Sequence, residues 1–168
     1  DFEEARDKVR WGRANRSRDV DDHDREMTAY HEAGHALVQF MLEDADPLHK
    51  VSIIPRGPMG GATFSLPEKD RLYYSKKYCL AQLQVCFGGR IAEEIFCDDV
   101  TSGAQSDIKQ ATMIAREMVT EWGMGEELGP IKYSQDPAEM YYSTGSEYSQ
   151  KTAETIDREI KNLIDQAY

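Results

Sequence analysis

Two histidines stand four residues apart in the stretch Ala-Tyr-His-Glu-Ala-Gly-His-Ala-Leu-Val at positions 29–38. The stretch is typical of a helix, and residues four apart lie on one helix face, so His31 and His35 are expected to point the same way. Two imidazoles at that spacing can bind one zinc ion, and Glu32 lies where a carboxylate could take a proton from a zinc-bound water. The rest of the chain must then supply a third ligand, a substrate-binding edge and packing.

Composition favours a single acidic globular domain. The chain has 168 residues, of which 40% are apolar and 30% charged, and this is enough for a sizeable core. A net charge of −11 argues against nucleic acid as the main partner. Three cysteines make no disulfide framework and favour a reducing compartment. No apolar run reaches the length of about 18 residues that a membrane-spanning helix needs.

Apolar periodicity predicts a mainly α fold with a small β-hairpin. Four longer helices are expected over residues 25–43, 70–97, 102–122 and 146–167. Two short strands at 51–54 and 62–66 flank a turn rich in glycine and proline. The charged segment 1–25 is expected to be a short helix followed by an exposed linker.

The helix expected over residues 25–43 is unusually apolar. Its stripe includes Tyr30, Ala33, Leu37, Phe40 and Met41. A helix with so narrow a polar side is predicted to be largely buried.

The second strand of the predicted hairpin has small polar side chains on one face, which suits a strand at the edge of a sheet. Its residues Gly61, Ala62, Thr63 and Phe64 are candidates for pairing with an extended peptide through backbone groups. The alternative is that the hairpin only covers the core, and the strand pattern does not decide between the two.

The third zinc ligand does not come from the first helix. A catalytic zinc usually has three protein ligands and one open position. In the extended form of the motif a glycine and a third histidine follow, but Val38 and Met41 occupy those positions here. Glu43 lies about 12 Å along the helix axis from His35, too far to share one ion.

Acids on the later helices remain as candidates for the third ligand. Asp107 falls on an apolar helix face, where an unpaired charge is costly and needs a metal, a cation or several donors. Glu93 stays an alternative, either as a ligand or as a residue that braces a histidine from outside the metal shell.

At this point the sequence resembles the FtsH family, the membrane-anchored, ATP-dependent AAA+ zinc metalloproteases. The resemblance rests on four motifs in the same order and at similar spacing, at residues 31–35, 54–57, 88–94 and 101–108. Residues 1–5 also resemble the end of the family's ATPase module, so the resemblance covers nearly the whole chain.

The resemblance implies one zinc ion per chain, bound by His31, His35 and Asp107, with Glu32 as the catalytic carboxylate. It places Glu93 near the site and makes the strand around 62–66 the substrate-binding edge. It implies that residues 1–25 are a linker from the ATPase module and that 26–168 form a helical zinc metalloprotease domain, truncated at its C-terminus.

The resemblance also implies partners and a location. Family members form a ring of six copies and act on protein substrates at the cytoplasmic face of the bacterial inner membrane. ATP would act only through the ATPase module, and the membrane would be reached only through transmembrane segments that precede it. The 168-residue piece itself is expected to be soluble.

Three hypotheses follow for the function. The favoured one is a zinc-dependent endopeptidase in which zinc-activated water attacks the peptide bond with Glu32 as general base, and the substrates are unfolded, misassembled or regulatory proteins. The second is an oligomerisation module that is inactive without the ATPase. The third is a structural zinc site, against which Glu32 argues because such a site needs no base.

Overall fold

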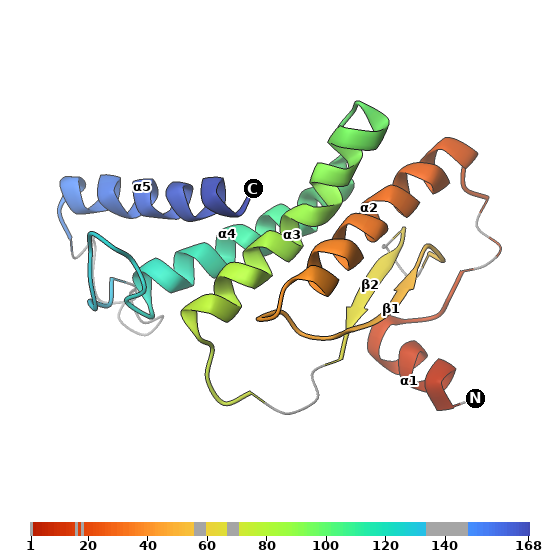
Figure 1. Ribbon diagram of the computed structural model, residues 1–168, viewed down its shortest axis with the longest axis horizontal. Helices are drawn as coiled ribbons and strands as arrows, with labels where there is room; N and C mark the ends of the chain where they lie inside the picture. Colours follow the sequence, from red (N-terminus) through yellow and green to blue (C-terminus); the bar gives the residue numbers. More distant parts are fainter. Residues whose placement is uncertain (1, 16, 18, 56–59, 67–70, 134–147) are drawn as a thin grey trace, which may run out of the picture.

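The computed structural model describes residues 2–15, 17, 19–55, 60–66, 71–133 and 148–168. Its elements are α1 (Phe2–Trp11), α2 (Asp22–Met41), β1 (Leu48–Ser52), β2 (Ala62–Ser65), α3 (Lys76–Cys97), a 3-10 turn η1 (Ser102–Ala104), α4 (Gln105–Thr120) and α5 (Gln150–Ala167). The two strands pair antiparallel and make a sheet of their own. A mainly α fold with a small hairpin is therefore confirmed (Figure 1).

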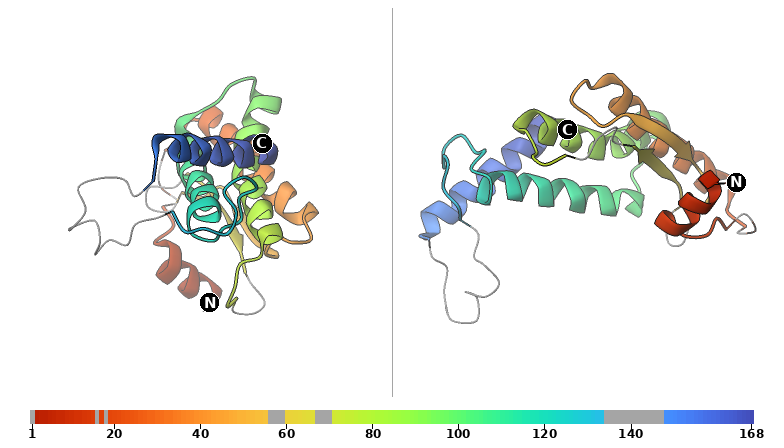
Figure 2. Two further views of the ribbon diagram at one scale, coloured as in Figure 1. Left: turned by 90° about the vertical axis from the view of Figure 1, so that its left-hand side faces the viewer. Right: turned by 90° about the horizontal axis from the view of Figure 1, so that it is seen from below.

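The central helix is α3, which packs against α2 on one side and against α4 and α5 on the other. Side chains that are almost completely buried form the main core between α3, α4 and α5, and they include Leu83, Phe87, Met118, Val119 and Ile156. The small sheet and α1 lie at the opposite end of the molecule from α5 (Figures 1 and 2). This leaves α2 between the helical core and the sheet.

The backbones of α2 and α3 touch where a glycine of each helix faces the other. A Cβ atom added to Gly34 would lie 2.2 Å from the carbonyl oxygen of Gly88, and one added to Gly88 would lie 2.7 Å from that of Gly34. Because α3 runs through Gly88 and Gly89 without a break, close approach of another helix explains the first of these glycines.

We expect Gly34→Ala to destabilise the fold by about 3 kcal/mol or more, at or above the usual range for overpacking, because the new methyl group meets backbone rather than a side chain that can move. Alanine's better helix propensity, about 1 kcal/mol, does not offset this. Urea unfolding measures the loss, with Gly60→Ala as the control, since its Cβ would meet only Thr28 Oγ1 at 3.6 Å. Equal stability of the two variants would contradict the close approach.

The prediction that the apolar stripe of α2 is buried is wrong. Leu37, Phe40 and Met41 are 64%, 76% and 70% exposed. The buried side of α2 is instead largely polar and consists of Met27, His31, Glu32, His35 and Gln39.

The buried polar side of α2 is matched by polar side chains of β2. The Thr63 hydroxyl donates to the Glu32 carboxylate, and the Gln39 amide donates to Ser65 Oγ at 2.8 Å. Thr63 and Ser65 lie on one face of β2, and both bond to α2. Within the described residues the sheet has two strands, so β2 lies at its edge, as predicted.

Several helix boundaries also differ from the prediction. α3 begins at Lys76, after the N-cap Ser75, rather than at residue 70. α5 begins at Gln150, after the N-cap Ser149, rather than at residue 146. In each case a serine that caps the helix marks a start that apolar spacing alone does not locate.

Hydrogen bonds join the segment before α2 to the β-hairpin. The Asp7 side chain is fully buried in α1 and accepts a hydrogen bond from Lys50 Nζ of β1 at 2.7 Å. Further along, the Asn15 N–H donates to the Pro55 carbonyl at 2.8 Å. Within the described residues, no helix is both long enough and apolar enough to cross a membrane.

Candidate metal centre

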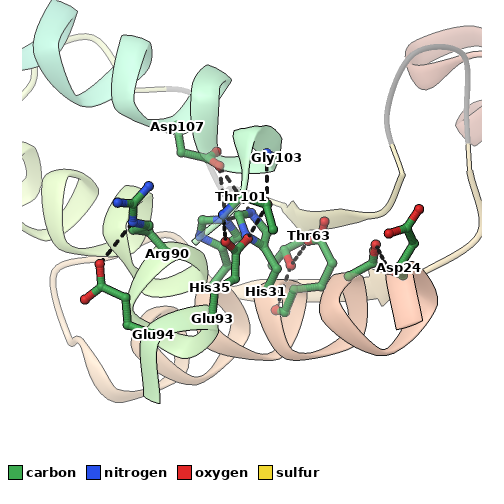
Figure 3. A network of polar contacts seen from close by, with 12 residues as sticks. Asp24, His31, His35, Thr63, Arg90, Glu93, Glu94, Thr101, Gly103 and Asp107 are labelled. Atoms are coloured by element: carbon green, nitrogen blue, oxygen red, sulfur yellow. Dashed lines mark hydrogen bonds and ion pairs between the residues drawn. The ribbon is translucent and has the colours of Figure 1, made fainter. Parts of the chain in front are cut away.

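Three predicted ligands from two helices come together at one point. His31 and His35 lie one turn apart on α2, and Asp107 lies in the first turn of α4 (Figure 3). The Nε2 atoms of the two histidines are 3.0 Å apart, and Asp107 Oδ2 lies 3.2 Å from His31 Nε2 and 3.6 Å from His35 Nε2. Among the described residues this is the one group whose donor atoms are placed to share a metal ion.

These spacings suit a zinc ion. Zinc–nitrogen and zinc–oxygen bonds of about 2.0–2.1 Å in a tetrahedral arrangement put neighbouring ligand atoms about 3.3 Å apart. The observed separations of 3.0, 3.2 and 3.6 Å lie on both sides of that value. Two imidazoles and one carboxylate are also a donor set that zinc prefers, and with three ligands a fourth position stays open for water.

The opposite nitrogen of each histidine has its own partner. His31 Nδ1 lies 2.6 Å from Glu93 Oε1, and His35 Nδ1 lies 2.7 Å from the backbone carbonyl of Val85. Both partners are acceptors, so each Nδ1 carries the proton and each Nε2 presents its lone pair to the shared point. Three electron-rich atoms this close together require a positive charge between them.

Electrostatics agree with that requirement. Burial opposes the charge on Asp107, but hydrogen bonds from His31 and His35 outweigh it and lower the pKa of Asp107 to about 2. Burial likewise tends to lower the pKa of His31, but the carboxylates of Asp107 and Glu93 outweigh it and raise that pKa. A proton and a metal ion would each bring positive charge to this point, so the two compete.

Gly89 of α3 leaves the space that the imidazoles occupy. A Cβ atom at Gly89 would lie 2.6 Å from His31 Nε2 and 2.6 Å from His35 Nε2. The two glycines of α3 therefore have separate roles. Gly88 lets the α2 backbone approach α3 closely, and Gly89 leaves room for the imidazole rings of His31 and His35.

Glu93 lies outside the group of three converging donor atoms. Its side chain is almost completely buried and accepts from the Thr101 backbone N–H at 2.8 Å and from the Thr101 hydroxyl at 3.2 Å, besides contacting His31 Nδ1. Its carboxylate is thus placed to orient a histidine, the second of the two roles left open for it by the sequence.

Glu32 is buried beside the ligands and faces β2. Its carboxylate Oε2 accepts from the Thr63 hydroxyl at 2.7 Å. Burial raises the pKa of Glu32, and the hydrogen bond from Thr63 works against that rise. Of the other candidates on the strand, Gly61 packs against the Glu32 side chain, and Phe64 is buried.

Comparison with known proteins places the chain in a family. The sequence pattern of Peptidase family M41 matches residues 18–168. The chain belongs to peptidase family M41. It is 50% identical over its full length to "ATP-dependent zinc metalloprotease FtsH 2" of Methylacidiphilum infernorum, 48% over 99% of its length to "ATP-dependent zinc metalloprotease FtsH" of Borreliella burgdorferi, and 51% over 98% to the protein of that name from Chlamydia trachomatis.

The family membership confirms the resemblance predicted from the sequence and the class of a zinc metalloendopeptidase domain. The chain spans only 27%, 27% and 18% of these three relatives. What the remaining parts of such proteins do is a separate question from what this M41 domain does.

A cavity of about 600 Å³ adjoins the M41 site. Its walls include Thr28, one turn before Glu32 on α2, as well as Gly60 before β2 and Thr101 and Gly103 of the turn that holds Glu93. Reasoning from the sequence missed Thr101 and the side-chain role of Thr63, because neither is a typical metal ligand or general base. The polar run Thr-Ser-Gly before α4 was the available signal for Thr101.

Proposed function

We propose that this domain is a zinc-dependent endopeptidase in which His31, His35 and Asp107 hold one zinc ion and Glu32 is the general base. The observation that carries the proposal is the convergence of three suitable donor atoms beside a buried carboxylate. A zinc ion held by these residues would acidify a water molecule and polarise a carbonyl group.

The protein's own contribution is proton transfer at Glu32. The Thr63 hydroxyl donates a hydrogen bond to Oε2 of Glu32. The other oxygen, Oε1, is then proposed to take a proton from the attacking water and return it to the leaving amine. Neutral imidazoles and one carboxylate leave the bound ion with a net positive charge. A structural zinc site would need no such carboxylate and would close its fourth position.

The substrate is proposed to bind in an extended form along β2. Within the described residues the sheet consists of β1 and β2, so β2 is an edge strand, the kind of strand with which an extended peptide can pair. The cavity beside Thr28 and Gly60 can then take side chains of that segment. This favours unfolded, misassembled or regulatory proteins, whose segments can become extended.

The larger assembly is also a proposal. The names of the relatives include ATP dependence, so we infer that residues 1–25 join an ATPase module to the peptidase domain of residues 26–168. That module would supply ATP-driven unfolding, a ring of six copies would enclose the sites, and segments before the module would anchor the protein at the bacterial inner membrane.

Cleavage of an unstructured protein tests the function directly. We expect the 168-residue chain to hydrolyse casein, to stop when zinc is removed by a chelator, and to recover when one zinc ion per chain is restored. Elemental analysis and sedimentation measured on the same samples give metal content and oligomeric state. A zinc-loaded, oligomeric chain that cannot cleave casein would instead favour the oligomerisation module that depends on its ATPase.

A further inference from the structure

The Glu32 carboxylate lies against Thr63 of β2 and Gly61, the residue that precedes this strand. On one side the Thr63 hydroxyl lies 2.7 Å from Oε2 (Figure 3). On the other side, a Cβ atom at Gly61 would lie 2.8 Å from Glu32 Cγ and 2.9 Å from Oε1. Gly61 directly precedes β2, and both Gly61 and Thr63 face the Glu32 side chain.

We propose that Thr63 is the positioning residue for the general base, and that its hydroxyl holds the Glu32 carboxylate in the orientation that proton transfer requires. This inference rests on the proposed peptidase function. A glutamate side chain has several rotatable bonds, so a buried carboxylate without a fixed donor would sample orientations that face away from the metal. The bond from Thr63 of β2 holds Oε2 and so selects one of these orientations.

The same hydroxyl can serve Glu32 before and after it gains a proton. Thr63 Oγ1 also lies 3.1 Å from the backbone carbonyl oxygen of Glu32. A hydroxyl carries one proton and two lone pairs, so it donates either to the carboxylate or to this carbonyl. When Oε2 is ionised it accepts from Thr63. When the carboxyl group is protonated, Thr63 can turn to the carbonyl and accept from the acid.

A purely structural role makes a different prediction. If Thr63 only ties β2 to α2 through the backbone carbonyl, its loss loosens the strand on which the substrate is proposed to bind. Weaker substrate binding, and hence a higher KM, would then follow. If Thr63 orients the base, the substrate binds as before and kcat falls.

The test compares Thr63→Val, which keeps the shape and removes the hydroxyl, with Thr63→Ser, which retains it. For the zinc-loaded chain and a fluorogenic peptide we expect Thr63→Val to lower kcat by about 10- to 100-fold, the cost of a misplaced catalytic group. KM should stay within about twofold, and Thr63→Ser should restore kcat to within about threefold of the unchanged chain. Zinc content should remain one per chain in all variants.

Thr112→Val is the matched control. The Thr112 hydroxyl donates to the Ile108 carbonyl of its own helix, so this variant loses an equivalent group outside the site and should keep its kcat. A raised KM with unchanged kcat in Thr63→Val, or failure of Thr63→Ser to restore activity, would overturn the inference.

A measurement without metal separates this inference from the proposed function. In the metal-free protein we expect Thr63→Val to lower the urea midpoint of unfolding, and to lower it by less than about half as much when Glu32→Ala is already present. Equal shifts in both backgrounds would mean that Thr63 does not hold the carboxylate. If the zinc-loaded chain cleaves nothing, the proposed function fails, while this cycle still decides whether Thr63 holds Glu32.

Discussion

Glu32→Gln is expected to abolish peptide cleavage while the chain still binds one zinc ion. Glutamine has nearly the same shape as glutamate, and its amide oxygen can still accept from the Thr63 hydroxyl, so the local structure should remain. An amide cannot take a proton from water at neutral pH. We therefore expect kcat to fall by about 1000-fold or more, within or beyond the usual contribution of a general base.

The measurement needs the rate and the metal content of the same sample. Casein or peptide hydrolysis gives the rate, and elemental analysis gives zinc per chain. Glu94→Gln is the control, because Glu94 is an exposed acid on α3 that pairs with Arg90 at 3.0 Å and takes no part in the site. A Glu32→Gln chain that still cleaves would remove Glu32 from the role of base. If Glu32→Gln loses zinc, its lost activity says nothing about the base, and another substitution of Glu32 that keeps zinc is measured instead.

The parts of this domain that could be predicted from sequence are those decided by spacing along one helix. His31 and His35 share a face because they are four residues apart, whatever surrounds them. The longer helices and the hairpin follow from periodicity for the same reason. Asp107 was predicted as a ligand because an unpaired charge on an apolar helix face is unfavourable. In the structure its carboxylate lies beside the two histidines.

What could not be predicted is which neighbour covers a given face. Periodicity shows that Leu37, Phe40 and Met41 lie together on α2, but it does not show what packs against them. Burial of apolar surface normally decides this choice. Here α2 turns its polar side inward, because β2 offers hydroxyl groups to Glu32 and Gln39, and because His31 and His35 meet Asp107 there.

The fine roles of Gly89, Thr63 and Thr101 also depend on contacts between distant segments. A glycine in a helix interior indicates close approach, but only the structure shows that Gly88 meets backbone and Gly89 meets imidazole rings. The Thr101–Glu93–His31 series of hydrogen bonds joins three elements, so no local pattern contains it.

Asp107→Asn should cost most of the zinc affinity. Asparagine offers a neutral amide oxygen in place of the carboxylate, so the ion loses an anionic ligand and its charge compensation. Because the pKa of Asp107 is lowered to about 2, its carboxylate is ionised at neutral pH. We expect the zinc dissociation constant to rise by more than about 100-fold, the upper end of what loss of a supporting group costs.

Glu93→Gln provides the matched comparison, because it also exchanges one buried acid for its amide. Glutamine can still accept from His31 Nδ1, so this variant should keep the ring orientation and lose about 10- to 100-fold in affinity. Competition with a coloured chelator gives both dissociation constants. The zinc-induced rise in Tm gives a second measure, since a ligand that binds only the folded state stabilises it by RT ln(1 + [L]/Kd).

The order of the two losses decides which acid is the ligand. A greater loss for Asp107→Asn means that the ion is bound where Asp107 Oδ2 meets the two Nε2 atoms. A greater loss for Glu93→Gln would transfer the ligand role to Glu93, and His31 would then meet the metal through Nδ1, the nitrogen that faces Glu93. Because Nδ1 cannot bind a metal and carry a proton for Glu93 at the same time, the two arrangements cannot coexist in one chain.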